Sequence, residues 1–217
     1  MAHRLLPFRQ YDENDVVNLY ALDADTLSTS LKLMDPNDDG INADGVLVKV
    51  TEGNMNLDTV DVGEDGRFQG SYNSPVGRNP YPTNPLKVAP AGSGDAVLGV
   101  TLRQTLSVDE NGESLLFNPV KKDELNAVLS GQTVPVLTRG VIAVHENGVG
   151  GNGDEVVGTK LAALGGKFVP AKADDKDFAV IGSIIGVGSR GDNKDNNYGG
   201  IRADQQSGKY YVIKLDC

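Results

Sequence analysis

The sequence has little of the side-chain chemistry on which most catalytic and metal sites depend. Its 217 residues include one cysteine, two histidines and no tryptophan. The cysteine, Cys217, has no partner for a disulfide within the chain, and a terminal thiol is rarely positioned for catalysis. His3 and His145 lack an accompanying serine or cysteine nucleophile and a second ligand at metal spacing. Cysteine and histidine therefore give no functional signal.

Long apolar runs and clustered positive charge are also missing. No apolar stretch approaches the roughly 20 residues of a membrane helix, and the N-terminus lacks the apolar region of a secretory signal. We therefore expect synthesis in a cytoplasm and no membrane partner. The chain carries 20 basic and 30 acidic side chains, a net charge of -10. This balance disfavours nucleic acid as a partner, because phosphate binding depends on clustered Lys and Arg.

What the chain does have is glycine, 27 residues of it, and strand-like segments between turns. Two apolar runs dominate, residues 95–105 and 134–144. Both are rich in β-branched side chains, and each contains a glycine, Gly99 or Gly140. This pattern is typical of strands that bend or pack closely on a neighbour.

Further segments predict strands, separated by Asp-Gly, Asn-Gly and Gly-Gly dipeptides that favour hairpin turns. A short amphipathic helix is an alternative for the first of them. One helix is predicted over 121–130, with Gly131 as its C-terminal stop. The pattern indicates a mainly β fold, an antiparallel β-barrel or sandwich with at most one or two short helices. The predicted strands cover residues 16–22, 45–51, 57–62, 67–72, 101–108, 114–117, 134–145, 156–164, 167–171, 178–187 and 210–215.

The domain organisation follows from these segments. Residues 1–15 are expected to form an extended N-terminal arm, and residues 16–217 one β-barrel or sandwich domain. Residues 57–92 are a candidate insertion or subdomain, and they include a proline-rich crossing over 75–90 that has no periodicity. Such a crossing suits an ordered excursion or a binding loop better than a linker.

Three side chains are weak candidates for a metal site. Asp35, Asn37 and Asp39, followed by Gly40, match the first half of a calcium loop. The twelfth position is Val46 where that loop has a bidentate Glu, and a strand is predicted there instead of a helix. Asp, Asn and Gly are also common turn residues. We therefore expect no resident metal or cofactor.

Two glycine motifs, residues 148–153 and 186–191, satisfy the dinucleotide-binding spacing G-x-G-x-x-G. Acidic or Asn-rich residues follow each of them, where a nucleotide site requires the start of a helix. They are interpreted as flexible turns. The tripeptide Arg-Gly-Asp at 190–192 is short enough to occur by chance. Carboxylates fall mostly in turns, where they usually form local hydrogen bonds, so the chain is predicted not to be an enzyme.

Several segments, taken in order, resemble the head decoration (cement) proteins of tailed bacteriophages. The start of the chain, residues 7–20, also resembles the N-terminal arm of a phage virion protein. The resemblance implies a compact β-barrel, although residues 57–90 depart from it. The segments that carry it are Gly45–Val50, Ala96–Leu102, Val134–Val144, Gly158–Leu161, Gly166–Pro170, Val180–Gly182 and Tyr211–Leu215.

The implied role is that of a structural virion protein. It would bind the outer surface of the expanded head and stabilise it by bridging neighbouring subunits of the major capsid protein. Whether the chain acts as a homotrimer stays open. One alternative is another virion part, such as a tail-tube or head-fibre component. The other is a β-barrel ligand-binding or enzymatic module with residues 75–90 as a lid.

On this interpretation the N-terminal arm would bind the capsid. An extended arm can add a strand to a neighbour's exposed sheet edge and gain main-chain hydrogen bonds. Leu5, Leu6 and Phe8 would supply apolar burial in that contact, and Arg9 a polar clasp.

Overall fold

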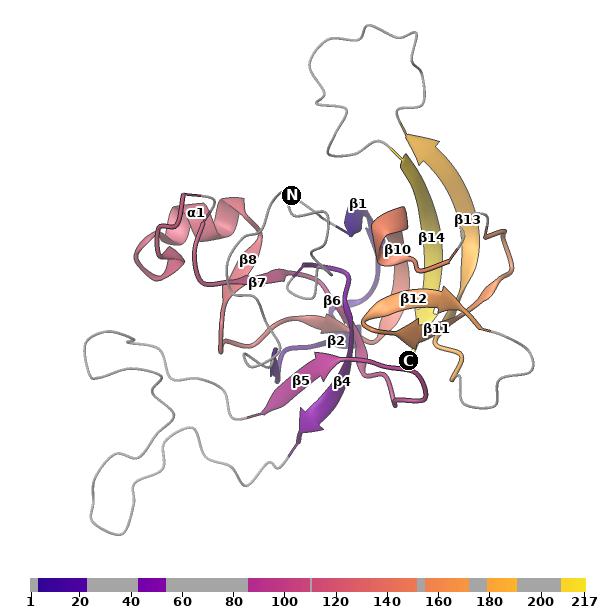
Figure 1. Ribbon diagram of the computed structural model, residues 1–217, viewed down its shortest axis with the longest axis horizontal. Coiled ribbons are helices and arrows are strands. Elements are labelled where there is room, and N and C mark those ends of the chain that lie inside the picture. The colour runs from indigo at the N-terminus through magenta and orange to yellow at the C-terminus, as the bar shows by residue number, and fades with distance from the viewer. Residues whose placement is uncertain are drawn as a thin grey trace, which may run out of the picture.

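The computed structural model describes residues 4–22, 43–53, 86–109, 111–151, 155–171, 179–190 and 208–217. The fold is mainly β, as the sequence predicts, and the strands within these ranges form two six-stranded sheets and one smaller sheet (Figure 1). All neighbouring strands of sheet A are antiparallel. In order across the sheet, they are β1 (Leu5–Gln10), β10 (Arg139–His145), β14 (Gly208–Asp216), β13 (Gly182–Arg190), β11 (Lys160–Leu164) and β12 (Lys167–Pro170).

Sheet B is antiparallel except for its last pair, β5 and β3, which run parallel. Its strands, in order, are β2 (Val16–Val17), β9 (Val136–Leu137), β6 (Gly99–Thr101), β4 (Leu47–Glu52), β5 (Lys87–Pro90) and β3 (Ala21–Leu22). The short 3-10 helix η1 (Glu13–Asp15) connects β1 to β2, and η4 (Glu146–Gly148) follows β10.

A third unit lies to one side of the two large sheets (Figure 1). It pairs β7 (Gln104–Leu106) in parallel with β8 (Ala127–Leu129). The connection between them contains the 3-10 helix η3 (Leu115–Phe117) and the helix α1 (Pro119–Glu124). We call residues 104–129 the β7–β8 unit. It has a small core of its own, formed by Leu106, Leu115, Leu125, Ala127 and Leu129.

The two large sheets share one hydrophobic core. Leu47, Val100 and Leu137 of sheet B belong to the same buried cluster as Phe168 and Ile213 of sheet A. The two sheets therefore face each other like the layers of a sandwich, and the described strands do not close into a barrel. A second cluster, containing Val46 and Val88, packs on the other side of sheet B.

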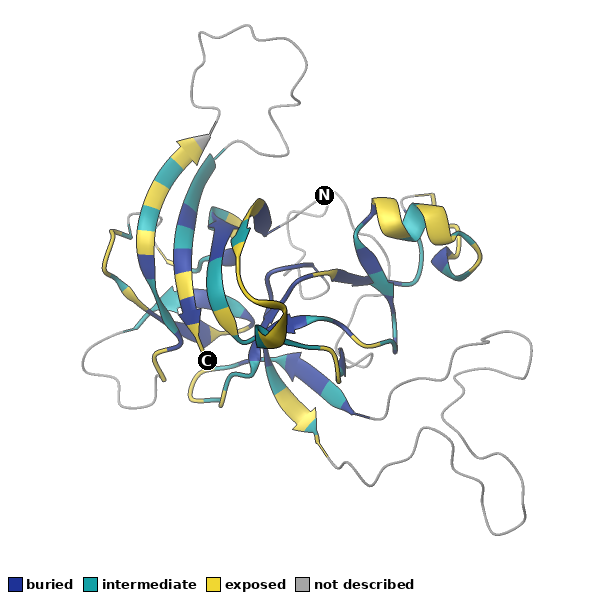
Figure 2. Cartoon of the chain, turned by 180° about the vertical axis from the view of Figure 1, so that it is seen from behind, coloured by how far each residue is buried: buried dark blue, intermediate teal, exposed yellow. Residues whose placement is uncertain are grey.

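The C-terminal segment forms strand β14 because buried side chains alternate with more exposed ones along it. Tyr211, Ile213 and Leu215 are buried, while Lys214 and Asp216 between and after them are exposed (Figure 2). This alternation has the period of two that a strand with one buried face requires. The prediction of a strand over 210–215 is confirmed, and β4 confirms the one over 45–51. The predicted strand over 16–22 is two short strands, β2 and β3, and the strands predicted over 156–164 and 167–171 contain β11 and β12.

The apolar run 134–144 is two strands where the sequence predicted one. Val136 and Leu137 belong to sheet B, and Arg139 begins β10 of sheet A. Thr138 lies at the change of sheet, where its N–H and its hydroxyl both donate to the carbonyl of Asp15 at 2.9 Å. Gly140 shows the close packing that the sequence pattern indicated, because its φ is +148° and a Cβ there would lie 2.7 Å from Cβ of Tyr11.

The predicted helix over 121–130 is wrong in its second half. Helix α1 ends at Glu124, and Asn126 adopts a left-handed φ of 49° that no helix continues through. Ala127–Leu129 then forms β8. The buried side chains of Leu125, Ala127 and Leu129 alternate, so strand geometry places all three in the small core. Within 114–117, predicted as a strand, Leu115–Phe117 form η3 instead, and Ser114 makes only an isolated β-bridge with Val108.

The segment predicted as an extended N-terminal arm includes a strand of sheet A. Leu5–Gln10 forms strand β1, which pairs with β10 at the edge of sheet A, so this part of the chain is not a free extension. Residues 57–85 of the candidate insertion lie outside the described part of the chain. Its last residues form β5, which pairs with both β4 and β3 and so belongs to sheet B.

Candidate functional site

The four residues nominated for capsid binding differ in burial. Leu5 and Leu6 are buried in the protein itself, Leu5 in the shared core, so neither is available to an outside partner. Phe8 is 53% exposed. Arg9 is half-buried, and its Nε donates weakly to the carbonyl of Leu6 at 3.5 Å. Only Phe8 and Arg9 remain candidates for contact with a partner.

Strand β1 is also poorly suited to accept a partner strand. Its pairing with β10 slips between Leu5 and Arg9, which marks a bulge, and Pro7 in this interval has no N–H to donate. Bulges and prolines are devices that protect sheet edges from pairing with other chains. Contact through β1 therefore depends on side chains, and Phe8 is its exposed apolar one.

The remaining candidates from the sequence are the two histidines and the three possible metal ligands. His3, Asp35, Asn37 and Asp39 lie outside the described residues. His145 is buried, and its Nδ1 accepts a hydrogen bond from the N–H of Asn147 at 3.3 Å, which caps η4. Among the described residues no three His, Cys, Asp or Glu side chains form a group that could hold a metal ion.

The glycine motifs take a different form from the predicted turns. Gly186 and Gly188 lie within strand β13, where a Cβ at Gly188 would meet the ring of Tyr210 at 2.3 Å. Tyr210 is the cross-strand partner of Gly188, so its ring covers the surface that this glycine leaves open. Gly148 ends η4, while residues 152–154 and 191–207 lie outside the described ranges.

Cys217 is exposed as a residue although protein atoms surround much of its thiol, and its N–H donates to the carbonyl of Thr138 at 3.1 Å. Desolvation, and then the charge of Asp216, raise the pKa of the Cys217 thiol to about 12. A thiol with such a pKa carries almost no thiolate near neutral pH, and the thiolate is the nucleophilic form. Cys217 is therefore a poor nucleophile.

A more prominent surface feature lies on the β7–β8 unit. Phe117, at the end of η3, is 75% exposed, and Val120, in the first turn of α1, is 68% exposed. We call these two side chains the apolar projection. They are held there because Leu115 and Leu125, on either side, are buried in the small core. Figure 2 shows the exposed surface of α1 at the edge of the molecule.

The sequence contained a signal for this helix that was missed. Asn118 is the N-cap of α1, and its Oδ1 accepts a hydrogen bond from the N–H of Lys121 at 3.4 Å. Pro119 follows at the first helical position. Asn followed by Pro is a typical start of a helix, and it places the helix start two residues before the predicted one.

A cleft of about 500 Å³ lies where the N-terminal segment, the β7–β8 unit and the edge of sheet B meet. Its charged lining residues are Arg9, Arg103 and Glu13. Val16 and Val128 contribute apolar walls, and the buried Leu102 also lines it. Sequence analysis missed this cleft because its residues come from segments far apart in the chain.

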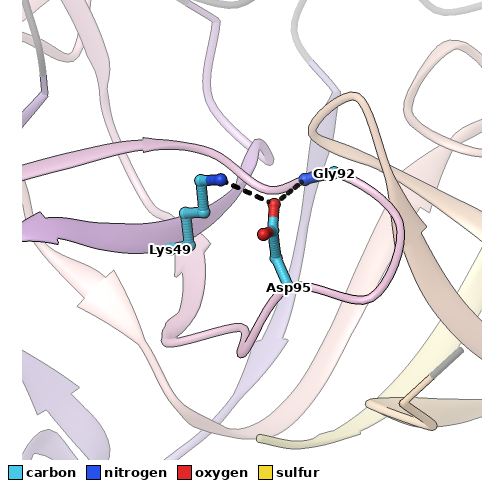
Figure 3. Close-up of polar contacts among 3 residues, drawn as sticks. All are labelled: Lys49, Gly92 and Asp95. Atoms are coloured by element: carbon cyan, nitrogen blue, oxygen red, sulfur yellow. Dashed lines mark hydrogen bonds and ion pairs between the residues drawn. The ribbon is translucent and has the colours of Figure 1, made fainter. Parts of the chain in front are cut away.

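A polar contact involving Asp95 lies in the connection between β5 and β6. Oδ2 of Asp95 accepts a hydrogen bond from the N–H of Gly92 at 2.6 Å and pairs with Nζ of Lys49 at 2.9 Å (Figure 3). These hydrogen bonds, that from Lys49 first, lower the pKa of Asp95 below its usual value. A carboxyl held in its ionised form does not serve as a general acid. The contact ties the loop to strand β4, which is a structural role.

No protein-family model, curated protein or solved structure matches this chain. In the described part of the chain, no helix is long and apolar enough to cross a membrane.

Proposed function

We propose that this chain is a structural virion protein that binds the outer surface of the expanded head of a tailed bacteriophage. It stabilises the head by bridging neighbouring subunits of the major capsid protein. The resemblance of the sequence to head decoration proteins supports this role, and so does the mainly β, two-sheet architecture. A protein that reinforces a shell adds interfaces between subunits, and these stabilise the assembled state by mass action.

The observation that carries the proposal is the apolar projection. Phe117 and Val120 stand three residues apart on one short helical connection, and both are more than half exposed. Aromatic side chains that enter a pocket on a partner are common centres of binding energy. Full burial of an exposed Phe or Val contributes about 1.5–3 kcal/mol. The projection therefore offers a compact anchor on a supported part of the fold.

The structure changes how binding to the head would work. The sequence suggested that an extended arm adds a strand to a capsid subunit. Because β1 is already paired with β10, the contact is assigned to exposed side chains of a folded surface, with the apolar projection as main anchor. Phe8 is a second apolar contact on a separate strand. Two such contacts on one folded chain suit a protein that bridges two subunits.

The proposal is tested by co-sedimentation of the purified protein with undecorated expanded heads and, in parallel, with unexpanded proheads. We expect saturable binding to expanded heads. Phe117→Ala should weaken this binding by about tenfold or more, which corresponds to about 1.4 kcal/mol. Val156→Ala is the matched control, since Val156 is an apolar side chain of similar exposure, 67%, outside the projection. Phe8→Ala tests the second contact.

Failure to bind expanded heads would sink the proposal and direct attention to tail tubes or head fibres. Binding that Phe117→Ala and Val156→Ala leave equally strong would show that the surface is wrong while the role stands. Because Phe117 and Val156 are both exposed, neither substitution should affect folding, which circular dichroism checks.

A further inference from the structure

The cleft between the N-terminal segment and the β7–β8 unit has an unusual charge for this protein. The chain as a whole carries a net charge of -10, yet the cleft is lined by two guanidinium groups, Arg9 and Arg103, and one carboxylate, Glu13. Among the described residues Arg103 is exposed and makes no ion pair or hydrogen bond through its side chain. Arg9 makes one weak hydrogen bond, to Leu6. Both guanidiniums are therefore available to an incoming anion.

The chemistry of the lining favours a carboxylate over a phosphate. A guanidinium presents a planar fork of donors that fits either group in a bidentate manner. Glu13 lies in the same lining and repels a dianion such as phosphate more strongly than a monoanionic carboxylate. A ligand with one negative charge near each arginine satisfies both conditions.

The remaining walls indicate what carries that carboxylate. Val16, Val128 and Pro135 provide an apolar surface beside the arginines. Tyr11, Asn18 and Thr133, which also line the cleft, are exposed. A small ligand is normally enclosed over most of its surface, and a cleft with so exposed a lining does not enclose one. A segment of polypeptide needs cover along one side only.

We infer that this cleft binds an extended peptide segment in which acidic side chains alternate with apolar ones. The carboxylates pair with Arg9 and Arg103, and the apolar side chains pack on Val16, Val128 and Pro135. The inference does not depend on the proposed virion role, because the partner is defined by this chemistry alone.

Two asparagines suit the backbone of such a segment. Asn18 and Asn126 line the cleft, and an amide side chain both donates and accepts, as a peptide group does. Asn126 lies between α1 and β8, and its backbone has a left-handed φ of 49°. Its Nδ2 makes only a long hydrogen bond, 3.5 Å, to the carbonyl of Leu102. This side chain can therefore turn to a better partner at little cost.

The test is a titration of the full-length protein followed by amide NMR spectra. The probe is the acetylated and amidated peptide Val-Glu-Val-Glu-Val, and its counterpart Val-Gln-Val-Gln-Val is the uncharged control. We expect saturable shifts of amides within 9–18, 102–103 and 126–135 with the acidic peptide. Arg103→Gln should weaken binding by about tenfold, because a hydrogen bond to a charged group is lost. Arg103→Lys, which keeps the charge but loses the fork, should fall between.

Arg139→Gln is the matched control. Arg139 is an exposed arginine that pairs with Asp216 at 3.5 Å and lies outside the cleft lining. Its replacement should leave peptide binding unchanged. Equal binding of the acidic and glutamine peptides, or shifts confined to other surfaces, would overturn the inference. So would an absence of shifts at millimolar peptide, or displacement of the peptide by inorganic phosphate at equal concentration.

Discussion

The N–H of Arg4 donates to Oδ1 of Asp44 at 2.9 Å, and both residues are buried. The same oxygen accepts the N–H of Leu5 at 3.4 Å. Arg4 continues the connection through Nη1, which donates to the carbonyl of Gly166 at 3.2 Å. Asp44 precedes β4 of sheet B, while Leu5 begins β1 and Gly166 lies in the β11–β12 turn of sheet A. One buried polar network thus joins the two sheets at the start of the chain.

Replacing Asp44 by alanine should destabilise the protein strongly. The substitution leaves the buried N–H groups of Arg4 and Leu5 without their acceptor, and an unsatisfied buried group of this kind costs about 1–3 kcal/mol. Urea unfolding followed by circular dichroism measures the loss. Asp216→Ala is the control, because Asp216 is exposed and pairs with an exposed Arg139, a contact worth at most about 1 kcal/mol. Similar losses for the two variants would show that the network contributes little.

Replacement of Thr101 and replacement of Thr105 should have opposite effects on the free energy of unfolding. The hydroxyl of Thr105 is buried and has no hydrogen-bond partner in the described structure. The hydroxyl of Thr101 accepts the N–H of Val46 at 3.0 Å and contacts the carbonyl of Ala43 at 3.4 Å. Thr105→Val should therefore be neutral or raise the free energy of unfolding by up to about 1 kcal/mol, whereas Thr101→Val should lower it by about 1–3 kcal/mol. Chemical denaturation of the two variants compares them directly. The reverse order would contradict the assignment of partners.

An element could be predicted from the sequence where its pattern of side chains fits only one type of secondary structure. The alternation over 210–215 fits a strand and no helix, and the glycines at 165 and 166 fit a tight turn, where their φ values are +59° and +72°. Residues 125–129 were ambiguous, because Leu125, Val128 and Leu129 share a helix face while Leu125, Ala127 and Leu129 share a strand face. Only the small core of the β7–β8 unit decides between them.

The site was harder to predict, because its features depend on contacts between distant segments. Leu5, Leu6, Phe8 and Arg9 look alike as candidate anchors in the sequence, and only the pairing of β1 with β10 separates the buried from the exposed. It also changes the obvious experiment. Deletion of residues 1–15 would remove the edge strand β1 of sheet A and the Arg4 network, so a loss of binding would report unfolding. Point variants such as Phe8→Ala avoid this problem.

Glycine 99 permits the close approach of β6 to β9. A Cβ at this position would lie 2.1 Å from the carbonyl oxygen of Leu137 in the neighbouring strand. Gly99→Ala should therefore push the strands apart and destabilise the protein by about 1–3 kcal/mol, the usual cost of an overpacked core. Gly186→Ala is the matched control within a strand, since its Cβ would meet only the side chain of Val212 at 3.3–3.4 Å. Thermal unfolding should show a much larger shift for position 99. Equal shifts in melting temperature would mean that β6 and β9 have room for a Cβ at position 99.

The contact of Asp95 with Lys49 and Gly92 makes a prediction about pH. These partners lower the pKa of Asp95 from its ordinary value of 3.8. A carboxyl whose pKa is lower in the folded state stabilises the fold above its unfolded pKa, and this stabilisation is lost as pH falls through the folded pKa. Asp95→Asn should therefore be less stable than the native chain at pH 6, and the difference should shrink below about pH 4. Because both side chains are about one-third exposed, 35% and 28%, salt should also reduce it. Carbon-detected NMR titration of the carboxyl checks the cause directly: Lys49→Met should raise the pKa of Asp95 toward 3.8. A native Asp95 that titrates at or above that value would refute the ion pair in solution.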